Sequence, residues 1–407
     1  MITCDFLVIG AGIIGTSIAR ELRSRYPDAG VVVIDKEKAP GAHASGRNSG
    51  VLHAGFYYTA DSLKARFTRE GNAALTAYCL DHGLPINRCG KLVVARDEAE
   101  DRLLDELLRR GRANGVELQE VDEKQAREIE PRARTWRRAI FSPTTSSADP
   151  HQVLGAMVRD AERAGVRFRF GLPYQEAGND GMVRAGDERI AAGYVINAAG
   201  LYADRIARDF GFSRHYSILP FKGLYLTSDE PPGAYRVHIY PVPDLEYPFL
   251  GVHFTIKVDG TAKIGPTAIP AFWREQYQGL DRFRLNEFLD ITRRSLGLLF
   301  HSEFGFTRLA VEELRKYSRR RMVELARELV TDLDASRFRR WGRPGIRAQL
   351  YDLRRRRLEM DFVLEGDGRS MHVLNAVSPG WTCSIPFARY VIDQVEHRLT
   401  TKASVNA

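Results

Sequence analysis

The 407-residue sequence predicts an α/β chain, α+β overall, with two domains. Its first apolar strands alternate with helical segments, which predicts a parallel sheet. From about residue 211 it contains short β segments separated by proline, glycine and aspartate, which predicts an antiparallel or mixed sheet. A last strand, glycine loop and helix close the chain in the same order as its beginning.

The beginning of the chain follows the order strand, glycine loop, helix, strand. Residues 5–9 form an apolar strand, and Gly10, Gly12 and Gly15 have the G-x-G-x-x-G spacing of a Rossmann-like dinucleotide-binding domain. The first glycine permits a tight turn, the second lets the backbone approach a pyrophosphate, and the third lets the helix pack on the strand. The next strand ends on Asp35, where a carboxylate would hold a ribose hydroxyl.

Hydrophobic periodicity and helix-end residues predict the remaining elements of this domain. Small residues at 44–50 and at the strand exit 197–200 suit backbone that lies against a ligand. The elements expected up to residue 198 are helices at 16–25, 61–82, 97–114 and 150–164, and strands at 30–34, 91–95, 139–141, 166–170 and 189–198.

Short β segments predict a second sheet, which would form the floor of a substrate pocket. They cover residues 219–226, 237–243, 251–255 and 262–266. A helix at 284–300 follows, and then a second helix, 311–330, with Leu314, Tyr317, Leu325 and Leu329 on one face. The last strand, 371–376, leads through a glycine loop into a helix that ends near His397. This order indicates that the C-terminus returns to the cofactor.

These elements predict two discontinuous domains. A dinucleotide-binding domain takes residues 1–85, 142–210 and 341–407, and a substrate-binding domain takes residues 86–141 and 211–340.

Composition narrows the class of protein. The hydrophobic content of 44% is ordinary for a globular chain, and no apolar run approaches the roughly 18 residues of a membrane span. No basic segment precedes the first apolar run, so we expect an uncleaved, cytoplasmic chain. The cysteines form no C-x-x-C pair and no cluster with histidine, so we expect reduced thiols and no metal site. They are Cys4, Cys79, Cys89 and Cys383.

The net charge of +8 is concentrated in one window. Between Arg308 and Arg357 there are 16 Lys/Arg and 7 Asp/Glu, which gives +9. No nucleic-acid motif and no interleaved aromatic residues accompany these charges, so we expect no nucleic-acid partner. A solvated basic face is the favoured interpretation, and peripheral contact with the anionic inner face of a membrane is the alternative.

Several stretches outside the glycine loop are typical of one family. They are Arg47-Asn48-Ser49-Gly50-Val51-Leu52-His53-Ala54-Gly55, Cys89-Gly90-Lys91-Leu92, Asn197-Ala198-Ala199-Gly200, Pro220-Phe221-Lys222-Gly223, Ile239-Tyr240-Pro241-Val242-Pro243, residues 249–255 and Gly345-Ile346-Arg347-Ala348-Gln349. On these motifs the chain resembles FAD-dependent oxidoreductases of the D-amino-acid-oxidase type, which have a glutathione-reductase-like fold. Within that group it is most similar to the L-2-hydroxyglutarate dehydrogenase/oxidase family. It departs from the family pattern at Leu224, Trp381 and Cys383.

The resemblance implies an FAD cofactor that is bound without a covalent bond, although relatives in the wider group attach flavin to a histidine at the position of His43. Leu172 would offer its backbone to the adenine, and Ala199 and Gly200 would lie near the phosphates. The start of the C-terminal helix would stabilise the reduced flavin ring through its N–H groups. The other residues expected to contact FAD are Gly10, Gly12, Ile13, Ile14, Gly15, Asp35, Lys36, Ser45, Asn48, Ser49, Gly50, Val51, Pro379, Gly380, Trp381 and Thr382.

A 2-hydroxy acid needs cations for its carboxylates and a base for its hydroxyl proton. Arg347 offers a planar guanidinium fork matched to a carboxylate, and Lys222 offers a second positive charge. His253 is the favoured general base, and His53 is a second donor or the alternative base. The tyrosines expected to hydrogen-bond the substrate are Tyr57 and Tyr240.

The resemblance therefore implies oxidation of an L-2-hydroxy acid, such as L-2-hydroxyglutarate or a related dicarboxylic acid, to the 2-oxo acid. A hydride would pass to flavin N5, and the electrons would continue to a membrane quinone or to oxygen. Two alternatives stay open. One is an amine, imino-acid or specialised alcohol oxidase of the same fold, which the residues Leu224 and Trp381 favour. The other is a flavin-binding regulator without turnover.

Overall fold

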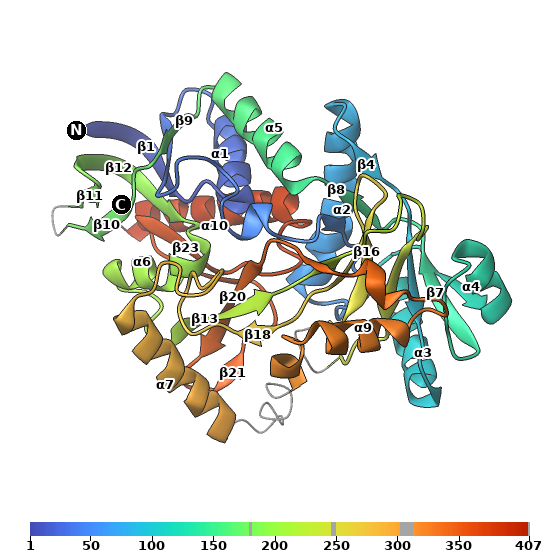
Figure 1. Ribbon diagram of the computed structural model, residues 1–407. Coiled ribbons are helices and arrows are strands. Elements are labelled where there is room, and N and C mark those ends of the chain that lie inside the picture. Colours follow the sequence, from blue (N-terminus) through green and yellow to red (C-terminus); the bar gives the residue numbers. More distant parts are fainter. Residues whose placement is uncertain (179–180, 246–249, 302–311, 406–407) are drawn as a thin grey trace. The chain divides into compact units, whose positions relative to one another are not determined.

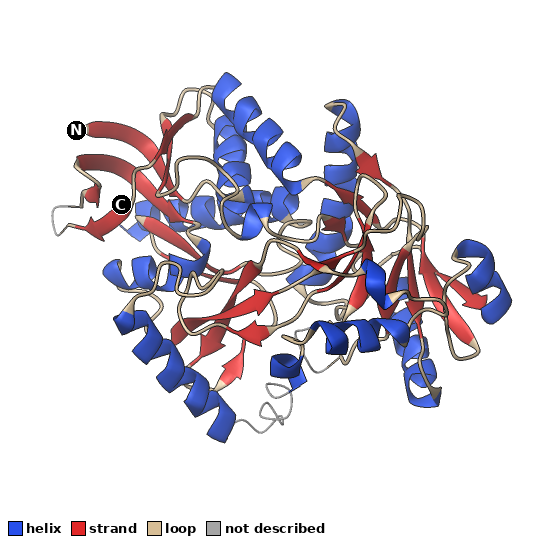
Figure 2. Ribbon diagram, in the orientation of Figure 1, coloured by secondary structure: helices blue, strands red, loops and turns tan. Residues whose placement is uncertain are grey.

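The computed structural model describes residues 1–178, 181–245, 250–301 and 312–405 (Figure 1). The chain forms two compact units, each made of separate segments. Unit 1 contains Met1–Asn48, Pro150–Leu219 and Ala348–Ala407, and unit 2 contains Ser49–Asp149 and Pro220–Arg347. Both units combine strands with helices (Figure 2).

The first boundary between the units lies earlier in the chain than the predicted domain boundary. We expected residues 1–85 in one domain, but residues from Ser49 onward belong to unit 2. Strand pairing gives the reason, because β3 (Val51–Leu52) and β4 (Ile86–Asn87) both pair with β8 (Ser146–Ala148). The helix α2 (Leu63–Asp81) contacts both β3 and β4. The segment 49–85 is therefore tied to strands that lie later in unit 2.

The central sheet of unit 1 is mainly parallel. Its strand order is β10-β11-β12-β1-β2-β9, with β23 paired to β12 and β22 paired to β23. The helix α1 (Ile13–Arg25) contacts both α5 (Pro150–Arg163) and α10 (Ser384–Val405) (Figure 1). The strands are β1 (Ile2–Ile9), β2 (Val31–Asp35), β9 (Arg167–Phe170), β10 (Tyr174–Ala177), β11 (Val183–Ala185), β12 (Glu188–Asn197), β22 (Val363–Gly366) and β23 (Ser370–Asn375). A short helix, α6 (Ala203–Asp209), follows β12.

The strand register brings distant segments to one edge of this sheet. Ile9 at the end of β1 lies opposite both Ile34 of β2 and Asn197 of β12. The strand β23 runs parallel to β12 and pairs with its last three residues, so the C-terminal strand returns to the sheet that begins the chain. The carboxyl ends of these parallel strands are where α/β folds bind their ligands.

Close contacts make glycine necessary at two positions of the loop between β1 and α1. Gly10 has φ +107°, a conformation that other residues rarely adopt, and a Cβ there would lie 2.6 Å from the carbonyl oxygen of Ala198. A Cβ on Gly15 would lie 1.9 Å from the carbonyl oxygen of Gly10. The helix α1 can approach the loop this closely only without a side chain at that position.

Unit 2 is built on a mixed sheet with the order β19-β14-β17-β16-β15-β5-β7-β6. We expected an antiparallel or mixed sheet, and the mixed character comes from the parallel pair β5–β15. The strands are β5 (Lys91–Val94), β6 (Gln119–Asp122), β7 (Arg138–Ser142), β14 (Leu226–Thr227), β15 (His238–Pro241), β16 (His253–Ile256), β17 (Ala262–Gly265) and β19 (Arg340–Trp341). The helices α3 (Glu98–Ala113) and α4 (Glu123–Ile129) lie between β5 and β7 in sequence.

Two longer strands carry the chain from one unit to the other. They are β13 (Tyr216–Gly223) and β20 (Gly345–Asp352). In unit 2 the end of β13 pairs with β18 (Ile269–Pro270), and in unit 1 the end of β20 pairs with β21 (Arg357–Leu358).

The predicted helix at 311–330 is wrong in its extent, and only the second half of its predicted apolar face is buried. Val311 lies outside the described residues, residues 316–318 form a turn, and a separate helix, α9 (Arg319–Arg327), begins after Ser318. Three successive i to i+3 hydrogen bonds end the first helical turn, and the chain restarts there. Leu314 and Tyr317 of the predicted face are exposed, whereas Leu329 is buried and Leu325 packs against the core. The helix α9 also buries Met322, Val323 and Ala326.

We predict that Gly15→Ala prevents stable binding of the FAD expected from the sequence. Its added methyl group would meet the Gly10 carbonyl oxygen, so α1 must move away from the loop that faces the pyrophosphate. The measurement is the flavin absorbance that remains with the protein after desalting.

Gly155→Ala is the matched control. Gly155 lies inside α5, where the nearest atom to a new Cβ is 3.4 Å away, so this change should keep flavin and stabilise the helix by about 0.5–1 kcal/mol. Equal flavin retention by both variants would contradict the role of Gly15.

Candidate active site

The loop between β1 and α1 in unit 1 is fixed by two side chains. Asp35 accepts the Ala11 N–H at 2.8 Å through Oδ2 and the Glu37 N–H at 2.8 Å through Oδ1. Ser45 Oγ accepts the Ile13 N–H at 2.9 Å, in the first turn of α1. Each Asp35 oxygen has a further lone pair, so the carboxylate can still accept a ribose hydroxyl. The helix geometry leaves the next N–H groups, those of Ile14 and Gly15, for a phosphate.

The short helix η1 (Ala44–Gly46) follows this loop in unit 1. The side-chain amide of Asn48 caps the end of this helix, donating to the carbonyl oxygens of Ala44 and Ser45 at 3.2 and 2.8 Å. Ser45 and Asn48 were expected along the flavin ring and ribityl chain. Ser45 lies at the start of α1, so within unit 1 it borders the phosphate-binding end of the loop.

The exits of the neighbouring strands supply the other predicted contacts in unit 1. Asn197 is fully buried, and its side chain donates to the Ala203 carbonyl oxygen at 2.8 Å and accepts the Ala199 N–H at 3.2 Å. This shapes the turn at Ala199 and Gly200, where Gly200 has φ +54°. The Leu172 N–H donates to the Asp35 carbonyl oxygen at 2.9 Å, so Leu172 lies beside the carboxylate expected to hold the ribose. Lys36 lies over the ring of Tyr202.

The C-terminal loop of unit 1 contains buried polar atoms whose hydrogen bonds a bound ligand would complete. It contains the predicted residues Pro379, Gly380, Trp381 and Thr382 and leads directly into α10. The Trp381 Nε1 and the Ser384 Oγ are buried and lack a hydrogen-bond partner among the described residues. Buried donors of this kind are normally satisfied, so they indicate a ligand with acceptor atoms at the start of α10. The carbonyl and nitrogen acceptors of a flavin ring match this requirement.

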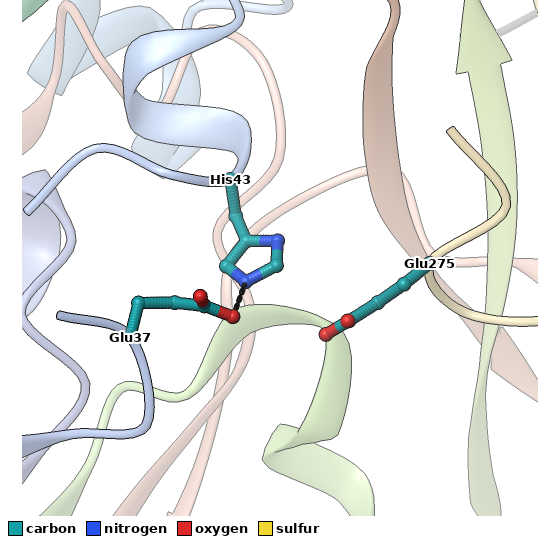
Figure 3. A group of neighbouring side chains, drawn as sticks. All are labelled: Glu37, His43 and Glu275. Carbon is teal, nitrogen blue, oxygen red and sulfur yellow. Dashed lines mark hydrogen bonds and ion pairs between the residues drawn. The ribbon is translucent and has the colours of Figure 1, made fainter. Parts of the chain in front are cut away.

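His43 contacts a carboxylate within unit 1. Its Nε2 lies 2.9 Å from Glu37 Oε1 (Figure 3). This contact engages the ring nitrogen and orients the imidazole toward Glu37, which favours the expectation of a flavin that is not attached to His43.

The predicted residues Ser49, Gly50 and Val51 belong to unit 2. Gly50 has φ +79° and its carbonyl oxygen accepts the Ala148 N–H at 2.9 Å, while Val51 pairs with Ser147 in the short β3–β8 ladder. Their backbone is thus held by the small sheet that also anchors β4.

One face of the unit 2 sheet carries a buried layer of polar residues. Side chains alternate along a strand, so in β5, β15 and β16 every second residue points to the same face. Leu92, Ile239 and Phe254 point to the hydrophobic core. The opposite face receives the apolar Val93 and, beside it, Lys91, His238, Tyr240 and His253, each of these four at most 3% exposed. We call Lys91, His238, Tyr240 and His253, together with His53 and Tyr57 of the loop of residues 52–58, the polar layer.

Direct contacts hold the polar layer together. The rings of Tyr240 and His253 stack with centroids 3.7 Å apart. The Lys91 ammonium lies 4.4 Å from the ring centroid of Tyr57, 4.5 Å from that of Phe56 and 5.0 Å from that of Tyr240. In the strand register Lys91 lies opposite His238. A cation over several aromatic rings is stabilised by their quadrupoles.

Hydrogen bonds define the tautomers of two imidazoles. The Nδ1 of His253 lies 2.8 Å from the Gly251 carbonyl oxygen, which only accepts, so Nδ1 carries the proton and Nε2 is the unprotonated nitrogen. His238 is the reverse case, because its Nδ1 accepts the Ile256 N–H at 3.0 Å. His253 therefore presents a nitrogen that can accept a proton.

Burial keeps the imidazoles of the layer neutral. Desolvation lowers the pKa of His253 to about 3 and that of His238 to about 3. Desolvation, together with the nearby charges of Lys91, His253 and His238, lowers the pKa of His53 well below its usual value. Desolvation also lowers the pKa of Lys91 to about 7. The layer thus holds neutral bases and one amine that titrates near neutrality.

Two asparagines and one arginine fix the loop that covers the layer, residues 52–58. The Asn72 amide donates to the carbonyl oxygens of Leu52 and His53 at 3.0 and 3.2 Å. The Asn114 amide donates to those of Gly55 and Tyr58 at 2.9 and 3.0 Å, and Arg110 donates to that of Tyr57 at 2.8 Å. Buried amides of this kind hold His53 and Tyr57 in place without a regular strand.

Two predicted substrate residues lie elsewhere in unit 2. Lys222 is on β13, which belongs to another sheet, and its ammonium forms no ion pair or hydrogen bond within the described residues. Burial lowers the pKa of Lys222. Arg347 is on β20, and its pKa is lowered to about 10 by desolvation, an effect that nearby Tyr58 opposes. Tyr58 belongs to the loop of residues 52–58, so Arg347 is close enough to this loop to be affected by it electrostatically.

Sequence reasoning brought His53, Tyr57, Tyr240 and His253 together but missed two members of the layer. Lys91 and His238 were read only as residues of a family stretch and of a strand. The signal for both is a charged or polar residue in the alternating position of an otherwise apolar strand, as in Lys91-Leu92-Val93 and His238-Ile239-Tyr240. That signal has meaning only once the opposite face is known to be core.

The chain is similar to known proteins over nearly its whole length. Residues 5–394 match the family model described as FAD dependent oxidoreductase. The mitochondrial L-2-hydroxyglutarate dehydrogenase of Nematostella vectensis is 37% identical over 97% of this chain and 91% of that protein. The L-2-hydroxyglutarate dehydrogenase of Escherichia coli strain K12 is 34% identical over 98% of this chain and 95% of that protein.

Solved structures share the fold at lower identity. An FAD-bound L-alpha-glycerophosphate oxidase from Mycoplasma pneumoniae has a TM-score of 0.77 at 20% identity, covering 97% of this chain and 95% of that chain. Glycine oxidase from Geobacillus kaustophilus has a TM-score of 0.72 at 18% identity, with 98% and 96% covered. With the family match across nearly the whole sequence, the chain belongs to the FAD-dependent oxidoreductases of the D-amino-acid-oxidase type.

Proposed function

We propose that this protein oxidises L-2-hydroxyglutarate to 2-oxoglutarate with FAD as the electron acceptor. The observation that carries the proposal is the polar layer of unit 2, where a neutral imidazole with an unprotonated Nε2 lies beside a buried lysine. A 2-hydroxy dicarboxylic acid needs both a base and fixed positive charge. The relatives named L-2-hydroxyglutarate dehydrogenase match this chain over nearly its full length, which supports the same substrate.

His253 is the residue proposed to take the hydroxyl proton. Its Nδ1–H is held by the Gly251 carbonyl oxygen, so the ring cannot rotate freely and Nε2 accepts the proton as the C2 hydrogen leaves with two electrons. A bound dianion adds negative charge near the ring, which stabilises the imidazolium that forms. His53 is the second donor or the alternative base, and Tyr57 and Tyr240 offer hydroxyl groups to the substrate.

Unit 1 is proposed to hold the FAD without a covalent bond. The glycine loop and the first turn of α1 would meet the pyrophosphate, Asp35 the ribose, and the start of α10 the flavin ring. When bound, FAD supplies a hydride acceptor at N5. Arg347 and Lys222 remain proposed carboxylate-binding residues of unit 2.

We predict that L-2-hydroxyglutarate bleaches the bound flavin under anaerobic conditions and yields one 2-oxoglutarate per flavin. D-2-Hydroxyglutarate, L-lactate and L-glutamate serve as comparison compounds in the same absorbance titration. Bleaching only by amino acids or by other alcohols would support the alternative oxidase chemistry instead. No bleaching by any compound would support a flavin-binding regulator.

We predict that His253→Ala keeps its flavin but slows flavin reduction by L-2-hydroxyglutarate about 10²–10⁴-fold, because a general base contributes on that order. Stopped-flow absorbance at the flavin band measures the rate. His215→Ala is the control, because His215 is an exposed histidine of unit 1. An unchanged reduction rate in His253→Ala would remove His253 from the role of base and point to His53.

We also propose that the protein docks on an anionic membrane surface, where a quinone would accept the electrons in place of oxygen. Within the part of the chain that the structure describes, none of the helices combines the length and the apolar character of a membrane span. The support comes from α7 (Leu285–His301, Figure 1), where Leu285, Leu289 and Leu296 fall on one side of the helix and are 61%, 58% and 46% exposed.

Basic residues accompany this apolar helix face. Arg284 and Arg293 are exposed at its borders, and the basic window of the chain continues after it, with residues 308–311 outside the described part. Exposed leucines flanked by arginine suit an interface of anionic headgroups and acyl chains.

We predict that the protein co-sediments with vesicles of phosphatidylglycerol and phosphatidylcholine at low salt, and that the double variant Leu285→Asp, Leu289→Asp binds about tenfold less. Leu80→Asp is the matched control, since Leu80 is an exposed leucine of α2 outside this face. A wild-type protein that stays in the supernatant would contradict membrane docking, and so would equal binding by wild type and the double variant.

A further inference from the structure

We propose that Lys91 is a specificity-determining residue that binds a carboxylate of the substrate and so selects dicarboxylic over monocarboxylic acids. This inference rests on the proposed function and adds a residue to which sequence reasoning assigned no role.

Lys91 is a buried cation without an acidic partner in the part of the chain that the structure describes. It is 1% exposed, and its ammonium forms no ion pair with an Asp or Glu among the described residues. Lysine is almost never buried unless it is paired, because removing an ammonium from water is costly. The aromatic rings that surround it offset part of this cost but add no negative charge.

The neighbouring strands and the covering loop add no negative charge either. The titratable groups that face Lys91 are His238 and Tyr240 of β15, His253 of β16, and His53 and Tyr57 of the loop of residues 52–58. Lys263 and Lys316 lie farther off and act on His253 as positive charges, although Lys316 is paired with Glu313. Among the described residues, the titratable groups around Lys91 are therefore neutral or positive, which suits an anionic ligand.

The hydroxyl groups of two tyrosines whose rings pack against Lys91 also lack partners among the described residues. The Oη atoms of Tyr57 and Tyr240 are buried and form no hydrogen bond within the described residues, while their rings lie 4.4 and 5.0 Å from the Lys91 ammonium. Burial raises the pKa of both phenols, so both stay protonated and act as donors. An ammonium and two hydroxyl donors together match the acceptor atoms of one carboxylate.

A lysine amine can gain or lose a proton near neutral pH, whereas an arginine guanidinium stays charged. In the free protein the pKa of Lys91 is lowered to about 7 by burial, so the amine can lose its proton when no anion is present. A bound carboxylate favours the ammonium and raises that pKa again. Binding of a dicarboxylate is then coupled to uptake of one proton above neutral pH.

The test compares Lys91→Met, which keeps the length of the side chain, with Lys91→Arg, which keeps the charge. Glutarate and butyrate are the probes, because neither can be oxidised at C2 and they differ by one carboxylate. Their binding to the FAD-loaded protein is followed by the perturbation of the flavin spectrum. We expect Lys91→Met to weaken glutarate about 10²-fold and to leave butyrate unchanged. Lys91→Arg should recover part of the glutarate affinity.

The pH dependence gives a readout that a merely structural role would not change. Wild-type affinity for glutarate should fall as the pH rises from 7 to 9, because the free amine must take up a proton to bind. Affinity of Lys91→Arg should stay constant over this range, because a guanidinium stays charged. Far-UV circular dichroism and flavin content establish that each variant is folded.

Failure of this inference can be told apart from failure of the proposed function. If L-2-hydroxyglutarate reduces the flavin but Lys91→Met binds glutarate and butyrate as wild type does, Lys91 has no part in carboxylate selection. An equal loss of glutarate and butyrate in Lys91→Met would also overturn the inference, because it would indicate a structural role. If glutarate binding depends on Lys91 but L-2-hydroxyglutarate does not reduce the flavin, the anion site stands and the proposed substrate is wrong.

Discussion

The placement of successive side chains of β5, β15 and β16 on opposite faces of the sheet is the constraint on which the candidate active site depends. Leu92, Ile239 and Phe254 must enter the hydrophobic core of unit 2, and this requirement fixes the strand register. The same register then places Lys91 and His253 on the opposite face. A slip of one residue would exchange core and site, so folding and positioning of the polar layer have one physical cause.

The two units position chemistry by different means. Unit 1 uses backbone, because Gly10 and Gly15 remove side chains where the loop, strand and helix meet, and Asp35 fixes the loop through its N–H groups. Unit 2 uses side chains held by buried amides such as Asn72 and Asn114. A dinucleotide presents the same phosphates in every family, whereas a substrate differs from one enzyme to another. Backbone recognition suits the first, and side-chain recognition suits the second.

The local elements and the family could be predicted from the sequence. The parts of the site that depend on pairing between residues far apart in the chain could not. The glycine loop and Asp35 are contiguous signals, so the first strand, helix and strand were predictable. The parallel pairing of β5 with β15 joins residues far apart in the chain, and only this pairing makes Lys91 buried beside His238. The break at residues 316–318 depends on turn hydrogen bonds that compete with a helical pattern, so periodicity alone predicted one long helix.

The most direct test of this account is a crystal structure of the FAD-loaded protein with glutarate bound. The account predicts one glutarate carboxylate within hydrogen-bond distance of the Lys91 ammonium and of the Tyr57 and Tyr240 hydroxyl groups, with the carbon chain beside Nε2 of His253. Glutarate bound away from the polar layer, with only water beside Lys91 and His253, would contradict it.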